Sequence, residues 1–87
     1  MVAVLLPNSL RALFPGAPST LDVHAGTVGA ALDELDRHWP GMRARLCDEH
    51  NAIRRHITLF VDGERARLDT ELSGASELIV MPAFSGG

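Results

Sequence analysis

The segment from Gly26 to Gly41, GTVGAALDELDRHWPG, has the most regular pattern in the chain. Its apolar side chains recur every three or four residues, which places them along one stripe of an α-helix. The stripe comprises Val28, Ala31, Leu32, Leu35, Trp39 and Met42. Thr27 can cap the first turn with its hydroxyl, and Pro40 followed by Gly41 disfavours a helical continuation. The segment predicts an amphipathic helix that must bury its stripe against another element.

Segments on both sides of this helix have the pattern of β-strands, with apolar side chains at alternate positions or in short runs. The expected strands are residues 2–6, 20–24, 57–61, a short return strand within 66–75, and 77–83. Asp62 and Gly63 form a strong hairpin signal, because both tolerate the positive φ of a tight turn. This order in 87 residues indicates the α+β class, specifically a ubiquitin-like β-grasp fold. We expect a mixed sheet of four to five strands packed on one main helix.

In a β-grasp fold the first and last strands lie side by side and parallel at the centre of the sheet. The expected core combines apolar residues of the strands and the helix: Val4, Leu6, Leu21, Val28, Leu32, Leu35, Ile57, Leu59 and Val80. A central last strand would hold the C-terminal residues out from a rigid body. We therefore expect a β-grasp domain over residues 1–83 and a flexible, extended tail over residues 84–87.

Composition and charge indicate one small domain that acts in the cytoplasm. The net charge is −3 and hydrophobic residues make up 46% of the chain; a chain of this size buries about 60% of its unfolded surface, enough for one core. A single cysteine allows no internal disulfide, and no export signal is recognisable. Apolar runs such as VAVLL are far shorter than the ~20 residues of a membrane span. The acidic balance also argues against binding to nucleic acid.

Three stretches resemble the MoaD/ThiS family of ubiquitin-like sulfur carrier proteins. HWPGMRARLCDE, residues 38–49, is similar to the Pro-Gly segment that follows the helix in MoaD-like members. RRHITLFVDGE, residues 54–64, is similar to their RRxxNVFVNGE strand and turn, with Thr58 where many have Asn. ELIVMPAFSGG, residues 77–87, is close to the family ending EVxIxPAVSGG, with Phe84 in place of a smaller residue. The resemblance covers nearly the whole chain and is closest to the CysO-like subgroup.

The resemblance implies that the C-terminus is the reactive part of the molecule. Gly87 would be adenylated by an activating enzyme and converted to a thiocarboxylate, while Gly86, Ser85 and Phe84 would be recognised as the tail. The implied partners are an E1-like adenylating and sulfur-transferring enzyme, which uses ATP, and a biosynthetic enzyme that accepts the sulfur. The chain would then be a co-substrate rather than an enzyme, with no bound cofactor and no metal. Glycines lack Cβ atoms, so they can pass through a narrow channel to reach a nucleotide.

Phe60 and Met81 are the expected partner-binding residues. Alternation along the strand puts Phe60 on the face opposite to Leu59, so we expect its ring to be exposed to solvent. Exposed apolar patches commonly mark protein interfaces, and Met81 and Leu5 would extend such a patch toward the tail. The alternative is that the segment of residues 40–55 covers Phe60.

A metal site or a nucleophilic cysteine is the alternative role for single residues. Cys47, His50 and His56 lack the paired spacing of a structural zinc site, and a Cys47 nucleophile would need a pocket that so small a domain is not expected to have.

The chain also fits a function of a different class, that of a ubiquitin-like modifier or interaction domain whose Gly-Gly end forms an isopeptide bond or is idle. As a sulfur carrier it fits cysteine synthesis, another sulfur-containing metabolite, or the small subunit of molybdopterin synthase. The eight basic residues are all arginine, which reflects codon usage or keeps amines away from an activated C-terminus.

Overall fold

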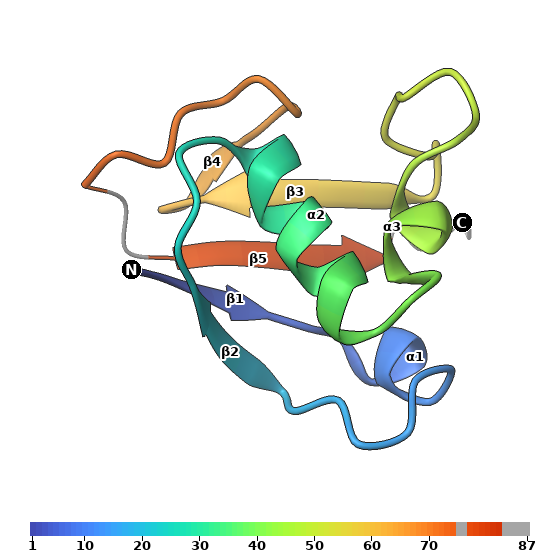
Figure 1. Ribbon diagram of the computed structural model, residues 1–87. Helices are drawn as coiled ribbons and strands as arrows, with labels where there is room; N and C mark the ends of the chain where they lie inside the picture. Colours follow the sequence, from blue (N-terminus) through green and yellow to red (C-terminus); the bar gives the residue numbers. More distant parts are fainter. Residues whose placement is uncertain (75–76, 83–87) are drawn as a thin grey trace.

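The computed structural model describes residues 1–74 and 77–82, which form a five-stranded sheet and three helices (Figure 1). The strands are β1 (Val2–Leu5), β2 (Thr20–Val23), β3 (Ile57–Val61), β4 (Glu64–Arg65) and β5 (Glu77–Pro82). The helices are α1 (Asn8–Arg11), α2 (Val28–His38) and α3 (Met42–Leu46). Helix α2 crosses one face of the sheet, and the two short helices lie toward the end where β5 stops.

The strand order is β2-β1-β5-β3-β4, which makes β5 the central strand. Strand β1 runs parallel to β5, with Leu5 opposite Ile79, and antiparallel to β2. Strand β3 is antiparallel to both β5 and β4. The parallel central pair of first and last strands confirms the predicted ubiquitin-like β-grasp arrangement, and the mixed sheet has five strands.

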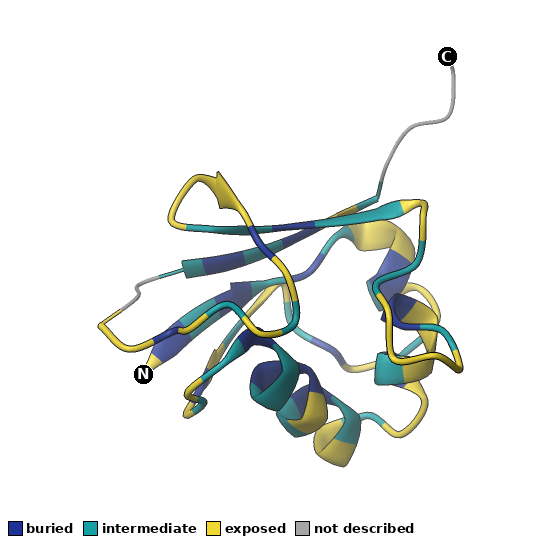
Figure 2. Ribbon diagram, turned by 90° about the horizontal axis from the view of Figure 1, so that it is seen from above, coloured by how far each residue is buried: buried dark blue, intermediate teal, exposed yellow. Residues whose placement is uncertain are grey.

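The core lies between α2 and the sheet face that it covers (Figure 2). Val28, Ala31, Leu32 and Leu35 of α2 are fully buried, so the predicted helical stripe is confirmed over these four residues. Alternate strand residues pack against the stripe: Val2, Val4, Val23, Leu59, Leu78 and Val80. Trp39 of the predicted stripe is half-buried, because α2 ends at His38.

The start of α2 is fixed both by a cap and by a close approach of the chain. The hydroxyl of Thr27 accepts a hydrogen bond from the backbone N–H of Ala30 at 3.2 Å, as a capping residue does. The N–H of Gly29 donates to the carbonyl of Leu68 at 2.9 Å. A Cβ at position 29 would stand 3.3 Å from the same carbonyl oxygen, so glycine suits this contact between α2 and the segment after β4.

Replacing Thr27 with Ala should lower the free energy of unfolding by about 1 kcal/mol, because the N–H of Ala30 loses its side-chain acceptor. Urea-induced unfolding followed by circular dichroism measures the change. Thr20→Ala, at an exposed position of the edge strand β2, is the matched control and should cost less than half as much. Equal losses in the two variants would contradict the capping role of Thr27.

The end of α2 turns directly into α3. The Asp36 Oδ1 atom accepts hydrogen bonds from the backbone N–H groups of Gly41 at 3.0 Å and Arg43 at 3.1 Å. Gly41 has φ of +99°, a conformation that glycine adopts without steric cost. Met42, which we assigned to the stripe of the preceding helix, instead begins α3. Met42 and Leu46 of α3 are fully buried. Helix α3 therefore closes one end of the core.

We expected Leu21 and Ile57 to be buried core residues, but their burial is only partial. Both are half-buried and pack against the core from positions with incomplete cover. Leu21 lies on the edge strand β2, and Ile57 is the first residue of β3. Leu46 and Leu78, which we did not expect in the core, are fully buried in it.

Two local elements also differ from the prediction. The return strand β4 comprises Glu64–Arg65 and not part of 66–75, because Asp62 (φ +48°) and Gly63 (φ +88°) turn the chain so tightly that pairing resumes at once. Helix α1 was not expected. It follows Pro7 and buries Leu10, which anchors the connection between β1 and β2 to the core.

Candidate functional site

Strand β5 ends at Pro82, where the predicted tail begins. It is the central strand, and Pro82 lies opposite Ile57, the first residue of β3. Because β5 is paired on both sides, the position of Pro82 is fixed within the sheet. The boundary predicted at residue 83 and the predicted site residues Phe84, Ser85, Gly86 and Gly87 lie outside the described residues. Their roles therefore stay predictions.

The sheet face opposite α2 carries apolar side chains that lead to this exit point. Leu5 of β1, Ile79 of β5 and Phe60 of β3 are consecutive neighbours across the sheet. Met81 lies on the same face of β5, two residues beyond Ile79, and is 43% exposed. We call Leu5, Phe60, Ile79 and Met81 the sheet patch. The patch ends one residue before Pro82, so a protein that covers it would also stand beside the tail.

Phe60 is half-buried, so its ring is less exposed to solvent than we expected. In register it stands between Ile79 of β5 and Arg65 of β4, and side chains on one face of paired strands cover each other in part. Ile79 was missed as a patch residue, although the alternation along β5 puts it on the same face as Met81. The partner-binding roles of Phe60 and Met81 stay predictions.

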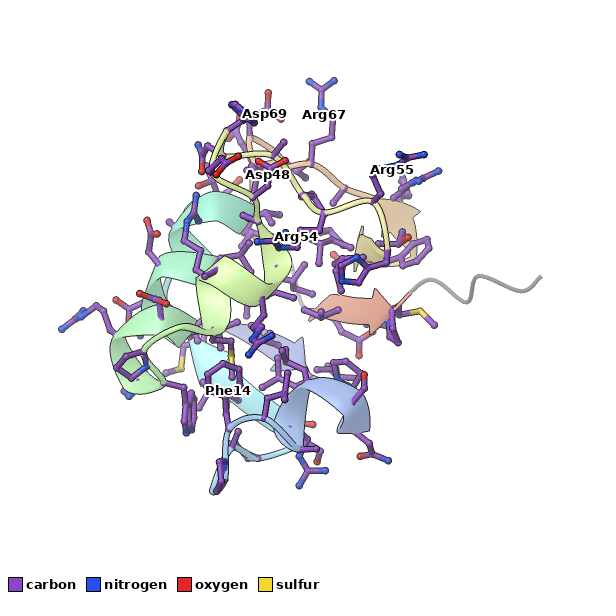
Figure 3. The ribbon with its side chains drawn as sticks, turned by 90° about the vertical axis from the view of Figure 1, so that its right-hand side faces the viewer. Phe14, Asp48, Arg54, Arg55, Arg67 and Asp69 are labelled. Carbon is purple, nitrogen blue, oxygen red and sulfur yellow. The ribbon has the colours of Figure 1, made fainter. Side chains whose placement is uncertain are left out.

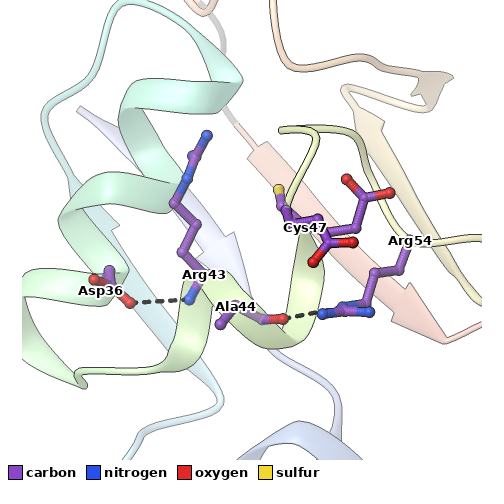
Figure 4. A pocket seen from close by; sticks show the side chains of 7 residues that line it. Asp36, Arg43, Ala44, Cys47 and Arg54 are labelled. Carbon is purple, nitrogen blue, oxygen red and sulfur yellow. Dashed lines mark hydrogen bonds between the residues drawn. The ribbon is translucent and has the colours of Figure 1, made fainter.

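A second region of interest is a cavity of about 510 Å³ beside α3 (Figure 4). Its lining combines charges of both signs with one thiol: Asp36, Arg43, Ala44, Cys47, Asp48, Glu49 and Arg54. The guanidinium of Arg54 donates from Nε to the carbonyl of Ala44 at 3.0 Å. Arg43 donates from Nη1 to the carbonyl of Gly29 at 3.2 Å and pairs with Asp33 at 3.3 Å. These arginines are thus engaged in holding α3 against α2 and the following loop.

Cys47 borders this cavity as a buried free thiol. Burial raises its pKa, an effect that the nearby Arg43 guanidinium only partly offsets. The thiol is therefore protonated at neutral pH, which is the wrong state for a nucleophile. Within residues 1–74 and 77–82 no three His, Cys, Asp or Glu side chains lie close enough together to hold a metal ion. In that same part of the chain no helix combines the length and hydropathy needed to cross a bilayer.

Cys47 should react with a disulfide reagent such as DTNB much more slowly in the native protein than in urea, by about a hundredfold or more, because burial limits both access and ionisation. The sign of the pH effect on stability follows from the same shift. The unfolded chain loses the thiol proton first as the pH rises through the ordinary thiol range, so the raised native pKa makes stability fall there. Cys47→Ala should remove this alkaline decline. Equal reaction rates in native and unfolded protein would contradict the burial of the thiol.

Comparisons with known proteins agree with the fold and extend over the tail. The ThiS family matches residues 4–87. The sulfur carrier protein CysO of Mycobacterium tuberculosis is 26% identical over 92 residues, which cover 99% of this chain and 98% of the relative. Small archaeal modifier protein 1 of Haloferax volcanii is 34% identical over 61 residues, 70% of each chain.

A solved structure matches the whole described architecture. The crystal structure of the Amycolatopsis orientalis BexX/CysO complex contains a chain that superposes on this one with a TM-score of 0.87 at 28% identity, with 100% of both chains covered. The match of the family over residues 4–87 includes strands β2 to β5, the last two residues of β1 and the Gly86-Gly87 end. The chain therefore belongs to the ThiS family.

Proposed function

We propose that this chain is a sulfur carrier protein whose Gly87 carboxylate is converted to a thiocarboxylate. The observation that carries the proposal is the extent of the family match, which continues to residue 87 and so includes the Gly86-Gly87 end. The similarity to a protein named sulfur carrier CysO over 99% of the chain supports it. So does the position of β5, because the predicted tail follows directly on the central strand of the sheet.

The proposed chemistry needs an activation step, because a carboxylate has no good leaving group. A carboxylate oxygen of Gly87 attacks the α-phosphorus of ATP, which forms an acyl adenylate and releases pyrophosphate. Hydrosulfide then attacks the carbonyl carbon, the bond to AMP breaks, and the products are a thiocarboxylate, AMP and a proton. No oxidation state changes when hydrosulfide is the donor. ATP is bound and used by the activating enzyme, and the carrier supplies only the acyl group.

In this scheme the carrier is a co-substrate and catalysis belongs to its partners. An E1-like enzyme activates Gly87, and a biosynthetic enzyme accepts the sulfur. The sheet patch is the proposed docking surface for these enzymes, because Met81 is exposed and lies one residue before Pro82. Apolar surface rimmed by polar groups is typical of protein interfaces. Because activation consumes ATP, we expect the carrier to act in the cytoplasm.

Cysteine synthesis is the receiving pathway that we propose, on the basis of the similarity to CysO. The CysO chain of Amycolatopsis orientalis is seen in a complex with BexX, so we expect this chain to form a comparable complex with a protein partner. The small subunit of molybdopterin synthase is the second candidate within the sulfur-carrier class, since it has the same fold and ending.

A ubiquitin-like modifier is the candidate from a different class, and the 34% identity to small archaeal modifier protein 1 favours it. Both functions begin with adenylation of Gly87. They differ in what displaces AMP, which is a sulfur nucleophile for a carrier and an amine of another protein for a modifier. The products are a thiocarboxylate in the first case and an isopeptide bond in the second.

The shared first step is tested by ATP–pyrophosphate exchange with the activating enzyme encoded in the same genome. Labelled pyrophosphate should enter ATP only when the carrier is present, because the exchange requires reversible formation of the Gly87 adenylate. Absence of exchange would contradict both functions. If exchange occurs, higher-mass conjugates in a mixture with cell proteins and without a sulfur donor would favour the modifier over the carrier.

A further inference from the structure

Four of the eight arginines line one hollow beside β3. Figure 3 labels three of them, Arg54, Arg55 and Arg67. Arg54 and Arg55 come from the loop before β3, and Arg65 and Arg67 come from β4 and the segment that follows it. We call the hollow between these four side chains the arginine groove. It has a volume of about 260 Å³ and adjoins a second hollow of about 480 Å³, with which it shares Ile53 and Arg67.

The floor of the arginine groove is apolar. Ile57 and Leu59 of β3 and Ala66 line it between the arginines. Leu59 and Ala66 are buried, and the N–H of Ala66 donates to the carbonyl of Leu59 at 2.8 Å. This bond attaches the wall that carries Arg65 and Arg67 to β3. A ligand that enters the groove thus meets an apolar surface below and guanidinium groups on both sides.

The positive charge of the groove is largely uncompensated. Arg55 and Arg65 are exposed, and the side chain of neither has a hydrogen bond or an ion pair within the part of the chain that the structure describes. Arg67 pairs with Asp69 at 3.2 Å, but both side chains are more than 70% exposed, and such pairs are weak and easily exchanged. Arg54 is fixed by its bond to the carbonyl of Ala44. The groove therefore offers three guanidinium groups to an incoming anion.

The wall that carries Arg54 and Arg55 is ordered before any ligand binds. The Asp48 carboxylate accepts hydrogen bonds from the N–H groups of Ala52 at 3.1 Å and His50 at 2.8 Å, which fix the turn at residues 48–52. These two hydrogen bonds lower the pKa of Asp48, and the bond from Ala52 has the larger effect. The N–H of Arg54 then donates to the carbonyl of Leu46 in α3 at 2.9 Å. A pre-ordered wall reduces the entropy lost on binding.

We propose that the arginine groove docks an extended acidic segment of the activating enzyme, with an apolar side chain of that segment on the groove floor. The proposal rests on the sulfur-carrier function proposed above and names the chemistry of its first partner. The groove lies close to the residue after which the predicted tail begins, because Ile57 on its floor lies opposite Pro82 in the sheet. An enzyme that takes Gly87 into its active site is therefore in reach of the groove.

The features of the groove favour a protein segment over a nucleic acid. The described lining contains no aromatic side chain on which bases would stack. The chain carries a net charge of −3, and the α2 residues Asp33, Glu34 and Asp36 would repel a long polyanion. A short acidic segment needs only the local positive charge. Such complementarity mainly accelerates association and depends on salt.

Arg55→Glu and Arg65→Glu should each raise the KM for the carrier in the loading reaction by about tenfold, with kcat unchanged, because the groove contributes to docking and not to chemistry. The matched control is Arg37→Glu, at an exposed position of α2 whose ion pair with Glu34 contributes little. Each of the three substitutions removes one positive charge and adds one negative charge, so each changes the net charge from −3 to −5. The KM of the control should change less than twofold. A rise in KM for Arg37→Glu equal to that for Arg55→Glu, or no rise in any variant, would overturn the proposal.

Salt dependence and a simple probe separate this proposal from the function on which it rests. The KM of the unchanged carrier should rise with added salt, and that dependence should weaken in Arg55→Glu.

If the unchanged carrier is not loaded at all, the proposed function fails. Binding to the groove is then tested by NMR with a synthetic peptide of alternating Glu and Leu. Shifts of groove amides with this peptide, absent with Gln in place of Glu, would uphold an acidic ligand. No binding, tighter binding of oligothymidylate, or a salt-sensitive dimer of the chain alone would overturn it.

Discussion

Removal of Gly87 should abolish sulfur loading and leave the fold unchanged. The new terminal carboxylate would belong to Gly86 and would stand one residue short of the nucleotide, a displacement of about 3.5 Å for an extended chain. Catalysis depends on reacting atoms being held within about 3–3.5 Å of each other, so a shift of this size removes the reaction. The core is assembled from residues between Val2 and Val80, so the free energy of unfolding should change by less than about 0.5 kcal/mol.

Two further chains make the result of this deletion specific. A chain that lacks Met1, which is 74% exposed, is also one residue shorter and should load normally. Gly87→Ala keeps the carboxylate in place and adds one Cβ, so it should load more slowly without losing activity completely. Intact mass and rates of AMP release measure loading, and urea unfolding measures stability. Normal loading of the chain that ends at Gly86 would contradict the assignment of the reactive group.

Phe60→Ala should weaken docking to the activating enzyme strongly, with a smaller loss of stability. Truncation of an aromatic residue at the centre of an interface typically costs 2 kcal/mol or more, which is about a thirtyfold loss of affinity. Phe60 stands between Ile79 and Arg65 on the sheet patch, where a partner would complete its burial. Because the ring is already half-buried, the free energy of unfolding should fall by about 1–2 kcal/mol, less than the 3–5 kcal/mol typical of a buried Phe.

The control for this substitution is Leu13→Ala, because Leu13 is an apolar residue that is 51% exposed and lies outside the sheet patch. It should change neither the affinity nor the stability by a measurable amount. Isothermal titration calorimetry with the activating enzyme gives the affinities, and urea unfolding gives the stabilities. A loss of stability above about 3 kcal/mol without a loss of affinity would show that Phe60 serves the core instead.

The sequence carried enough information for the central elements of the fold. Helix α2 was predictable because Val28, Ala31, Leu32 and Leu35 repeat at helical spacing between a capping Thr27 and a terminating Pro40-Gly41. The hairpin after β3 was predictable because Asp62-Gly63 permits two successive residues with positive φ. These signals are local. They can be recognised in the sequence without knowing which segments are in contact in the folded chain.

The elements that the sequence did not predict depend on tertiary contacts. Helix α1 has only four residues, Asn8–Arg11, and is too short to give a periodic signal. Leu46 belongs to the core because α3 is brought against α2, which no local pattern specifies. Leu78 could have been predicted, since it alternates with Val80 on the buried face of β5. The half-burial of Phe60 results from its register with Ile79 and Arg65. Register between distant strands is set by the whole fold.

In the candidate site, too, some residues could be identified from the sequence, whereas others depend on the fold. Gly86-Gly87 was identified from the sequence through its resemblance to a family ending; the family match over residues 4–87 includes these residues, and their role stays a prediction. The sheet patch and the arginine groove depend on the order β1-β5-β3-β4, because each draws its residues from several strands. Arg55 and Arg65 are ten residues apart in sequence, and only the turn after β3 brings them to one hollow.

The central claim is that Gly87 carries sulfur, and intact-mass spectrometry after incubation with ATP, the activating enzyme and sulfide tests it most directly. One oxygen of the chain should be replaced by sulfur, and tandem mass spectrometry should locate the change at Gly87. The change should disappear without ATP and in the chain that ends at Gly86. An unchanged mass, despite ATP–pyrophosphate exchange with the same enzyme, would contradict the sulfur-carrier function and favour a protein modifier.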